Sequence, residues 1–235
     1  MRDHDRPVGS GVTPRVAVVD DGSQTRDTFQ IAYPELRLEG AFATVDSLIA
    51  SRPVVDLVIL DLMLSTGLHE RAVLQGPPAI RALGDLGYRV CLYTDERRPL
   101  VLAHCLAAGA TGLVRKSDSL ATNQQAFVRA ADGQVVIARS LVGLAEILNR
   151  RGRLPTLTER QLQVLTARAR GEPWDSIARR LSISAKTAAD RLEAVMSKMV
   201  WFLHDVGLDP DASPADIERV LGLAPGDLMD PRTAR

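Results

Sequence analysis

The chain has 235 residues, of which 46% are hydrophobic and 25% charged. This composition indicates a globular protein of two ordinary domains and excludes a fibrous or wholly disordered chain. The 29 basic and 29 acidic residues balance, so any surface that binds nucleic acid must be local. Two cysteines suit a reducing compartment. The longest apolar run, 54–64, is too short to span a membrane, and the N-terminus lacks the apolar core of a signal peptide. We therefore expect a cytoplasmic protein.

The first part of the chain alternates between short apolar runs and segments of helical periodicity. A polar, Gly- and Pro-containing arm over 1–14 comes before this pattern. Alternation of strands and helices predicts an α/β fold with a parallel sheet covered on both faces. The run 54–62 is almost wholly apolar, as a strand buried on both faces should be. The expected strands are 15–20, 36–42, 54–62, 88–94 and 111–115, and the expected helices are 24–33, 44–51, 77–86, 97–108 and 118–131.

Polar side chains lie at the C-terminal ends of four of the five predicted strands, where a purely structural sheet would not need them. They are Asp20 and Asp21, then Asp61, Thr94 and Lys116. Because the carboxyl ends of parallel strands meet at one edge, these groups should converge there. Three neighbouring carboxylates repel one another unless a cation intervenes, which makes a Mg²⁺ site sensible. A carboxylate beside Mg²⁺ and a lysine is equipped to accept a phosphoryl group. Taken one at a time, each residue could instead cap a helix or face solvent.

These residues lie in the motifs VVDD (18–21), VILDLM (58–63), YT (93–94) and GATGLVRK (109–116). With these motifs, residues 15–131 resemble the receiver domain of two-component response regulators. The resemblance implies a flavodoxin-like, doubly wound five-stranded parallel sheet with Asp61 as the phosphoacceptor. It implies that Asp20, Asp21, Asp61 and the main-chain carbonyl of Met63 hold Mg²⁺. It also implies that Thr94 and Lys116 bind the phosphoryl oxygens and relay the modification.

The sequence departs from this family in two places. The family usually has an aromatic switch residue three positions before the lysine, where this chain has Leu113. The segment after Asp61, over 64–76, is also longer than the family norm and carries His69, Glu70 and Arg71. It could form a lid over the phosphorylation pocket or receive another signal. It could equally be a tolerated surface insertion, because lengthening a loop costs little.

The second part of the chain has helical periodicity from Leu157 to Met199. Within it, WDSIARRLSISAKTAADRL reads as a helix, a tight turn and a second helix with Ser184 as N-cap. This helix-turn-helix resembles the DNA-binding domain of LuxR/NarL-type response regulators. We expect a small all-α domain over 157–200, joined to the receiver by a linker with a helix. The resulting division is an arm over 1–14, a receiver over 15–131, a linker over 132–156, the helix-turn-helix domain over 157–200 and an acidic extension over 201–235.

Charge separates along the chain in a way that supports this division. Residues 150–199 carry eleven basic and five acidic residues, whereas 15–149 and 200–235 have an acidic excess. A local excess of six positive charges can hold a phosphate backbone, although clustered charge can also be a solvated face. The acidic extension could cap the core, dimerise the domain or cover the basic surface. The expected DNA-binding residues are Lys186, Thr187, Ala189, Asp190, Arg191 and Arg179.

The second helix of the motif has an unusual composition for reading DNA. Ala189 can touch only a thymine methyl, and Asp190 can accept from cytosine but repels phosphates. Trp174, just before the first helix, could lie against the DNA backbone or in the core. Either the sequence preference is unusual, or affinity is low until a dimer forms, or the surface contacts protein.

Together these features predict a bacterial response regulator and transcription factor, switched by phosphorylation of Asp61 and not an enzyme in the ordinary sense. Its partners would be a histidine kinase, DNA with palindromic or tandem half-sites, and a second copy of the chain. Three alternatives stay open. The receiver could be controlled by a ligand or partner without phosphorylation, or the chain could be a protein-binding adaptor. A phosphohydrolase is a further option, but it usually needs a carboxylate two residues after the nucleophile, where this chain has Met63.

Overall fold

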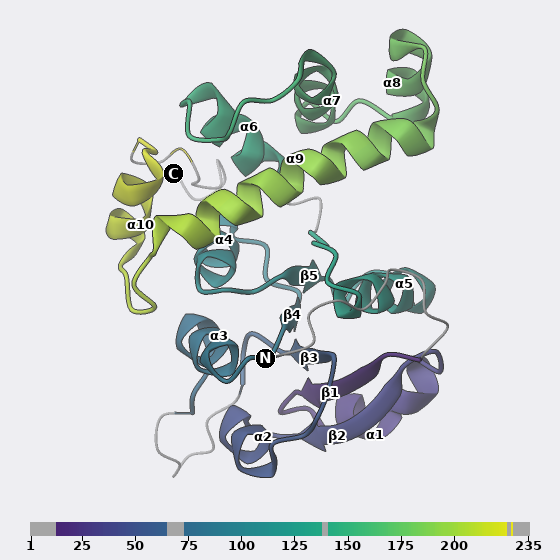
Figure 1. Cartoon of the computed structure of the whole chain (residues 1–235), viewed down its shortest axis with the longest axis vertical. Helices are drawn as coiled ribbons and strands as arrows, with labels where there is room; N and C mark the ends of the chain where they lie inside the picture. Colours follow the sequence, from purple (N-terminus) through teal and green to yellow (C-terminus); the bar gives the residue numbers. More distant parts are fainter. Residues whose placement is uncertain (1–12, 65–72, 138–140, 225–226, 228–235) are drawn as a thin grey trace, which may run out of the picture.

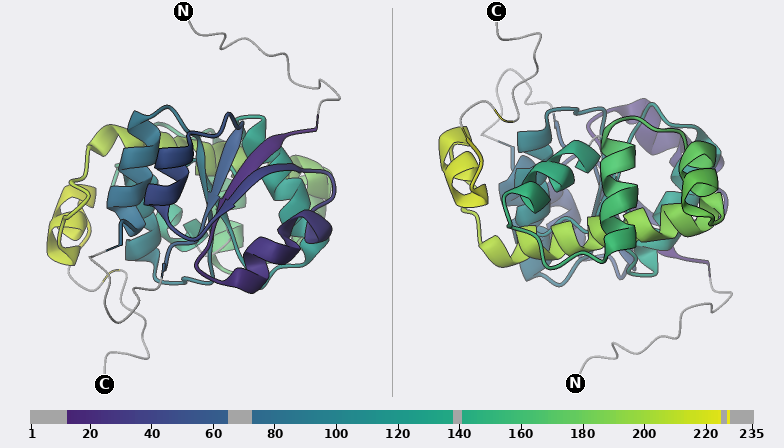
Figure 2. Two further views of the ribbon diagram at one scale, coloured as in Figure 1. Left: turned by 90° about the horizontal axis from the view of Figure 1, so that it is seen from below. Right: turned by 90° about the horizontal axis from the view of Figure 1, so that it is seen from above.

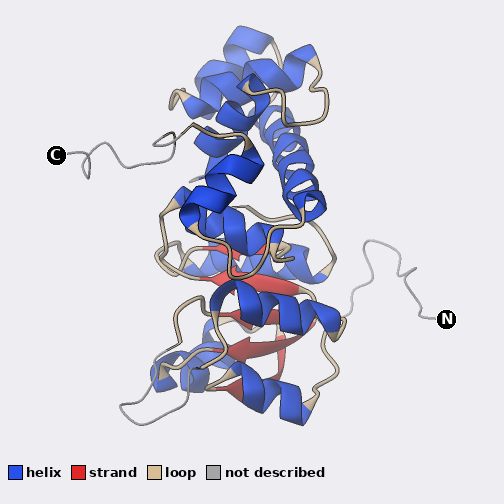
Figure 3. Cartoon of the chain, turned by 90° about the vertical axis from the view of Figure 1, so that its left-hand side faces the viewer, coloured by secondary structure: helices blue, strands red, loops and turns tan. Residues whose placement is uncertain are grey.

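The computed structural model describes residues 13–64, 73–137, 141–224 and 227. An α/β part built around one sheet lies below a cluster of helices, and the long helix α9 runs between the two (Figures 1 and 3). The sheet has five parallel strands in the order β2-β1-β3-β4-β5, which confirms the predicted fold class. The strands are β1 (Arg15–Val19), β2 (Arg37–Phe42), β3 (Leu57–Leu60), β4 (Val90–Tyr93) and β5 (Gly112–Val114).

The central strands are short and apolar. All four residues of β3 and all four of β4 are buried, as expected for strands covered on both faces. β3 is shorter than the predicted run 54–62, because Val54 is exposed and Asp56 accepts a hydrogen bond from the Arg15 N–H at the start of β1. The functional end of each strand is therefore reached after only three to six residues.

Helices cover both faces of the sheet (Figure 2). One face packs against α1 and α5 and has its own buried cluster, which is rich in aromatic side chains. The opposite face packs against α2, α3 and α4. The helices are α1 (Ser23–Ala32), α2 (Val45–Ser51), α3 (Gly76–Asp85), α4 (Pro99–Ala107) and α5 (Leu120–Ala131).

The C-terminal part is helical, as predicted. Thr158 and Gln161 form a capping box at the start of α7, and Ser184 caps α9 by accepting a hydrogen bond from the Thr187 N–H at 2.9 Å. Ser182, in the left-handed region at φ 54°, makes the tight turn between α8 and α9. The helix-turn-helix is therefore α8-turn-α9. The helices of this part are α6 (Val142–Arg150), α7 (Glu159–Ala169), α8 (Trp174–Leu181), α9 (Ala185–Val206) and α10 (Pro214–Leu221).

Helix α9 continues seven residues beyond Met199 and packs along α4. It ends at Gly207, whose positive φ of 66° is the usual left-handed helix terminus. His204 of α9 lies 3.3 Å from the Ala110 carbonyl, and His104 of α4 lies 2.7 Å from the Asp209 carbonyl. One apolar core consequently runs from the α2–α4 face of the sheet through α9 into the helical part. Helix α4 is largely buried for this reason.

The described part of the acidic extension caps this core. In α10, Ile217 and Leu221 are buried, and α10 contacts α4 near the C-terminal end of α9 (Figure 1). Arg153 of the linker donates a hydrogen bond to the Val220 carbonyl. Of the three roles considered for the extension, its described residues therefore fit capping of the core. They do not cover the start of α9.

Two sequence-based expectations fall largely outside the described residues. The arm over 1–14 is described only at its last two positions, and the lid hypothesis concerns 65–72, including His69, Glu70 and Arg71. The base of that insertion is described. There, the Leu64 N–H donates a hydrogen bond of 3.0 Å to the Gln75 side-chain carbonyl. The two ends of the insertion are thereby held together beside Asp61.

Among the described residues, no helix has the length and apolar character that crossing a membrane requires.

Candidate functional site

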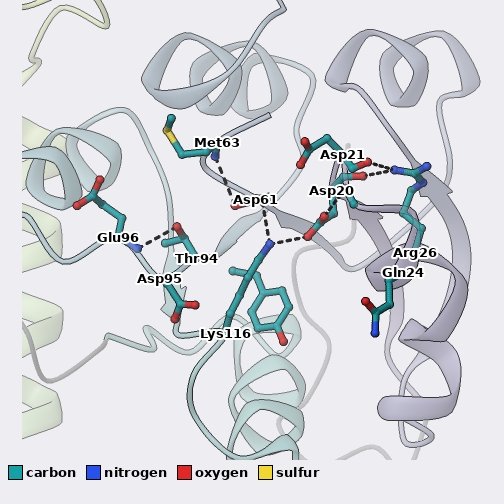
Figure 4. Close-up of polar contacts among 12 residues, drawn as sticks. Asp20, Asp21, Gln24, Arg26, Asp61, Met63, Thr94, Asp95, Glu96 and Lys116 are labelled. Carbon is teal, nitrogen blue, oxygen red and sulfur yellow. Dashed lines mark hydrogen bonds and ion pairs between the residues drawn. The ribbon is translucent and has the colours of Figure 1, made fainter. Parts of the chain in front are cut away.

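Three carboxylates meet at the carboxyl edge of the sheet, as the sequence predicts (Figure 4). Asp20 and Asp21 follow β1, and Asp61 follows β3. One oxygen from each lies within 4.8 Å of the others. Asp20 and Asp61 are buried, and Asp21 is partly exposed. Burial of like charges this close is unfavourable unless positive charge compensates it.

Lys116 supplies part of that compensation. Its Nζ donates hydrogen bonds to Asp20 Oδ2 at 2.7 Å and to Asp61 Oδ2 at 2.8 Å. One ammonium between three carboxylates leaves the pocket with net negative charge if all are ionised. Lys116 therefore holds two carboxylates together, and the pocket retains capacity for a further cation.

The loop after β1 is fixed by main-chain contacts. The Gly22 N–H donates to Asp20 Oδ1 at 2.8 Å, and Arg26 of α1 donates to the main-chain carbonyls of Asp20 and Asp21. Arg26 thus fixes the main chain from which the two carboxylates project. The sequence-based prediction missed Arg26. The feature that could have indicated it is a basic residue in the first turn of the helix that follows Asp20 and Asp21.

Thr94 and Met63 complete the predicted set. Thr94 is buried at the end of β4, and its Oγ1 accepts a hydrogen bond of 3.2 Å from the Glu96 N–H. The Met63 N–H donates to Asp61 Oδ1 at 3.4 Å, whereas the Met63 side chain is exposed. The strand ends therefore bring all the predicted pocket residues to one edge.

Burial and charge shift the pKa values in this pocket in opposing ways. Burial raises the pKa of Asp61, and the hydrogen bond and charge of Lys116 only partly offset this effect. Burial of the ammonium opposes ionisation of Lys116, but its bonds to Asp20 and Asp61 outweigh this, so its pKa is raised. Ionised Asp61 is consequently less stabilised in the folded protein than in water, and a bound cation would correct this.

This shift predicts a pH-dependent stability difference between the wild type and Asp61→Asn in metal-free buffer. The raised pKa means that folded Asp61 holds a proton at pH values where the unfolded chain has released it. Ionised Asp61 therefore costs stability at neutral pH, and the cost disappears as pH falls through the folded pKa. We expect Asp61→Asn to be the more stable protein at neutral pH, with the difference shrinking on acidification towards the ordinary value of 3.8. Urea unfolding of both proteins across this range measures it, and a difference independent of pH would contradict it.

The donor set fits Mg²⁺. Hard divalent cations prefer oxygen ligands, and Mg²⁺ is commonly held by one or two carboxylates together with water and substrate phosphate. Asp20, Asp21 and Asp61 offer such oxygens close together and partly desolvated. These three residues could hold the ion, and the Met63 carbonyl remains a predicted fourth ligand.

The aromatic side chain near Lys116 is not at the position where the family resemblance would place it. Leu113, at the position where the resemblance would place an aromatic residue, is buried in the core shared with α4 and α9. Tyr93, noted in the sequence only as part of a short motif, lies with its ring centroid 5.6 Å from Lys116 Nζ. The aromatic contact to the lysine therefore comes from the end of β4 and from the opposite face of the sheet.

A second group of predicted residues lies at the start of α9 and on α8. Lys186 is exposed and forms a salt bridge of 3.0 Å with Asp190, four residues later in the same helix. Arg179 of α8 is also exposed, whereas Thr187, Ala189 and Arg191 are partly buried. Trp174 packs partly against the core with Arg168 stacked 4.5 Å from its ring, which supports its structural role.

The receiver-like part contacts this helix directly. Arg129 of α5 forms a salt bridge with Glu193 of α9, and both side chains are about 40% exposed, at 41% and 39%. Glu193 lies on the same stripe of α9 as Lys186 and Asp190, at helical spacings of seven and three residues, so the Glu193 end of this stripe faces α5 while Lys186 at its start stays exposed.

Comparisons with known proteins agree with this architecture. Residues 155–201 match the model of the luxR family of bacterial regulatory proteins. A stretch of 122 residues is 30% identical to the transcriptional activator protein ExaE of Pseudomonas putida; this is 49% of the present chain and 57% of ExaE. The match therefore spans little more than half the length of that relative.

Solved structures that are similar to the chain include RcsB, a response regulator. One of these structures is RcsB from Salmonella enterica serovar Typhimurium, bound to a promoter in the presence of a phosphomimetic. Its sequence is 18% identical to this chain, and the two structures superpose with a TM-score of 0.50. The match covers 83% of this chain and 97% of the RcsB chain. The signal receiver domain assigned to NarL of Mycobacterium tuberculosis is 22% identical with a TM-score of 0.43, covering 52% of this chain and 98% of that domain. The chain thus has the fold of RcsB, an α/β part built on a parallel sheet followed by a helix-turn-helix, and its residues 155–201 match the luxR family of bacterial regulatory proteins.

Proposed function

We propose that the chain is a response regulator that accepts a phosphoryl group on Asp61 and controls transcription through its helix-turn-helix. The observation that carries this proposal is the pocket itself. Lys116 bridges Asp20 and Asp61 beside Asp21, in the same chain as a luxR-family domain. The combination of an acidic phosphoacceptor site and a DNA-binding motif is what a phosphorylation-switched regulator needs.

The chemistry follows from the roles of the side chains. A carboxylate oxygen of Asp61 forms a bond to phosphorus while the bond from phosphorus to the donor's leaving group breaks, which leaves an acyl phosphate. Mg²⁺, held by Asp20, Asp21, Asp61 and the Met63 carbonyl, would neutralise charge on the phosphoryl oxygens. Lys116 is already 2.8 Å from Asp61 Oδ2 and is placed to bind one of those oxygens. The Thr94 hydroxyl, at the neighbouring strand end, is the donor for another.

The proposed output is DNA binding by α8 and α9. Ser184 fixes the start of α9, so that Lys186 and Thr187 stand at the helix N-terminus, where phosphate groups bind favourably. Arg179 would reach the DNA backbone, Arg191 is the candidate guanine or phosphate contact, and Ala189 and Asp190 would face base edges. A homodimer would match two palindromic or tandem half-sites.

The phosphodonor in the cell would be a histidine kinase. The domain division that accompanies this proposal is a receiver over 15–131, a linker over 132–156, a helix-turn-helix domain over 157–200 and an extension over 201–235. The receiver would catalyse its own phosphorylation and the hydrolysis of its own acyl phosphate. The chain would have no other enzymatic activity.

Replacing Lys186 by Ala tests the DNA-binding part of the proposal. We expect affinity to fall by roughly three- to tenfold for every DNA sequence, because a phosphate contact is lost whatever the base. The slope of log affinity against log salt concentration should become shallower by about one. Arg37→Ala removes the same charge from β2, far from α9, and should leave both quantities unchanged.

A mobility-shift series across salt concentrations on captured genomic fragments measures both effects. No retained fragment at low salt would overturn the transcription-factor proposal and favour an adaptor whose helix-turn-helix contacts protein. Equal loss in Lys186→Ala and Arg37→Ala would overturn the placement of α9 on the DNA.

A second candidate function is control without phosphorylation, and Leu113 favours it. A buried leucine has no hydroxyl or ring with which to respond to a change at Thr94. In this alternative a small molecule or partner protein would act through the insertion after Asp61. Incubation with acetyl phosphate and Mg²⁺ followed by intact-mass measurement separates the two, because only the first candidate predicts a phosphoryl gain that depends on Asp61.

A further inference from the structure

We propose that Tyr93 is a positioning residue with two separable roles, resting on the proposed phosphorylation of Asp61. Its ring places Lys116 in the pocket, and its hydroxyl, paired with Tyr33, transmits the state of the pocket to the α1–α5 side of the sheet.

The ring of Tyr93 stands between the pocket and the core. Tyr93 is the last residue of β4, directly before Thr94, and is only 8% exposed. Lys116 Nζ lies 5.6 Å from the ring centroid, within the distance at which a cation is attracted to an aromatic face. The same ammonium bonds Asp20 and Asp61. Any displacement of Lys116 towards a phosphoryl group on Asp61 therefore changes its contact with this ring.

The hydroxyl of Tyr93 connects the ring to a different element. It lies 2.8 Å from the hydroxyl of Tyr33, which is itself buried at the C-terminal end of α1. Buried hydroxyls need a partner, since a buried polar group without one is costly. The Asn123 side chain of α5 also reaches the Tyr93 hydroxyl. Movement of Tyr93 must therefore carry Tyr33 with it or take this partner away from the Tyr33 hydroxyl.

Aromatic packing extends the connection to α5. Tyr93 meets Phe127 of α5 edge-on at 5.4 Å, and Tyr33 meets the same ring at 5.2 Å. Phe29 of α1 completes the cluster through contacts with Tyr33 and Phe127. Phe127 of α5 thus packs in a group of rings that includes Tyr93 beside Lys116, and Arg129 of the same helix forms a salt bridge with Glu193 of α9.

The opposite face of the sheet is less able to respond. Leu113 points into the core shared by α4, α9 and the helical part. That core is continuous and closely packed, and α9 lies against α4 along it. A route through α1 and α5 requires no rearrangement of this interface.

Four variants of the full-length protein test the two roles. Tyr93→Leu removes the ring, Tyr93→Phe keeps the ring but removes the hydroxyl, and Tyr33→Phe removes the hydroxyl partner. Tyr88→Phe is the matched control, because the Tyr88 hydroxyl donates to the Pro53 carbonyl at 3.0 Å, outside the pocket. Two readouts are taken: the rate of phosphorylation by acetyl phosphate with Mg²⁺, by intact mass, and the change in hydrogen exchange of residues 23–33 and 120–131 on phosphorylation.

We expect the phosphorylation rate of Tyr93→Leu to fall about fivefold, as loss of a partly buried cation–π contact would produce, and that of Tyr93→Phe to stay within about twofold of wild type. Tyr93→Phe and Tyr33→Phe should both lose the exchange response of α1 that wild type and Tyr88→Phe display. A wild-type rate in Tyr93→Leu would overturn the first role. A retained α1 response in both hydroxyl variants would overturn the second, even if Tyr93→Leu does not fold. If the wild type itself takes up no phosphoryl group, the proposed function fails and this inference fails with it.

Discussion

Replacement of Asp61 by Asn is expected to abolish phosphoryl uptake completely. The amide of Asn is a poor nucleophile, although it has nearly the shape of the carboxylate it replaces. Lys116 keeps its bond to Asp20 at 2.7 Å, so the pocket should stay folded. Intact mass after incubation with acetyl phosphate and Mg²⁺ should show one added phosphoryl group in the wild type and none in the variant.

Asp56→Asn is the matched control for this experiment. Asp56 lies just before the other end of β3, where its carboxylate accepts a hydrogen bond from the Arg15 N–H at 2.9 Å. Its replacement should leave phosphorylation unchanged. Uptake by Asp61→Asn equal to that of the wild type would place the acceptor elsewhere, and loss in both variants would point to a folding defect.

Replacement of Leu203 by Ala is expected to destabilise the whole chain by about 2–5 kcal/mol, the usual cost of truncating a fully buried leucine. Leu203 lies in α9 beside His204, within the core that joins the receiver-like part to the helical part. The Arg129–Glu193 salt bridge, at about 40% exposure of each side chain, should contribute no more than about 1 kcal/mol to the same interface. Apolar packing of α9 on α4 therefore dominates the association of the two parts.

Because this core is continuous, we expect one cooperative unfolding transition that shifts as a unit in Leu203→Ala. Chemical denaturation followed by circular dichroism and by tryptophan fluorescence should give coincident curves. Trp201→Ala, two residues away in the same helix and 68% exposed, should change the unfolding free energy by only about 0.5 kcal/mol. Two separate transitions, of which Leu203→Ala moves only one, would contradict the continuous core.

The fold could be predicted from sequence because its signals are local. Alternating apolar runs and helical periods gave all five strands and the order of the helices, and Ser184 marked the start of α9. The length of α9 was harder to predict: Val200, Trp201 and Leu203 continue the apolar periodicity, but only the packing against α4 makes that segment part of one helix. Burial of α4 depends on the same long-range contact, and its local signal is the almost wholly apolar sequence PLVLAHCLA.

The pocket residues could be predicted because parallel strands bring their carboxyl ends together. That rule placed Asp20, Asp21, Asp61, Thr94 and Lys116 at one edge without knowledge of any contact. Tyr93 was not singled out, because a tyrosine in a buried strand usually belongs to the core, and it does pack there. Its contacts with Lys116 and Tyr33 depend on the face of the sheet from which its side chain projects, and the sequence of β4 alone does not reveal that face.

The measurement that tests the central claim most directly is DNA affinity before and after phosphorylation, at one fixed salt concentration. Genomic fragments captured by the wild-type protein serve as the probe, and the wild type and Asp61→Asn are compared with and without acetyl phosphate and Mg²⁺. We predict that acetyl phosphate changes the affinity of the wild type at least about fivefold, the lower range of allosteric coupling, and leaves that of Asp61→Asn unchanged. Equal responses of the two proteins, or no response in a wild type that carries the phosphoryl group, would contradict the claim that Asp61 switches the helix-turn-helix.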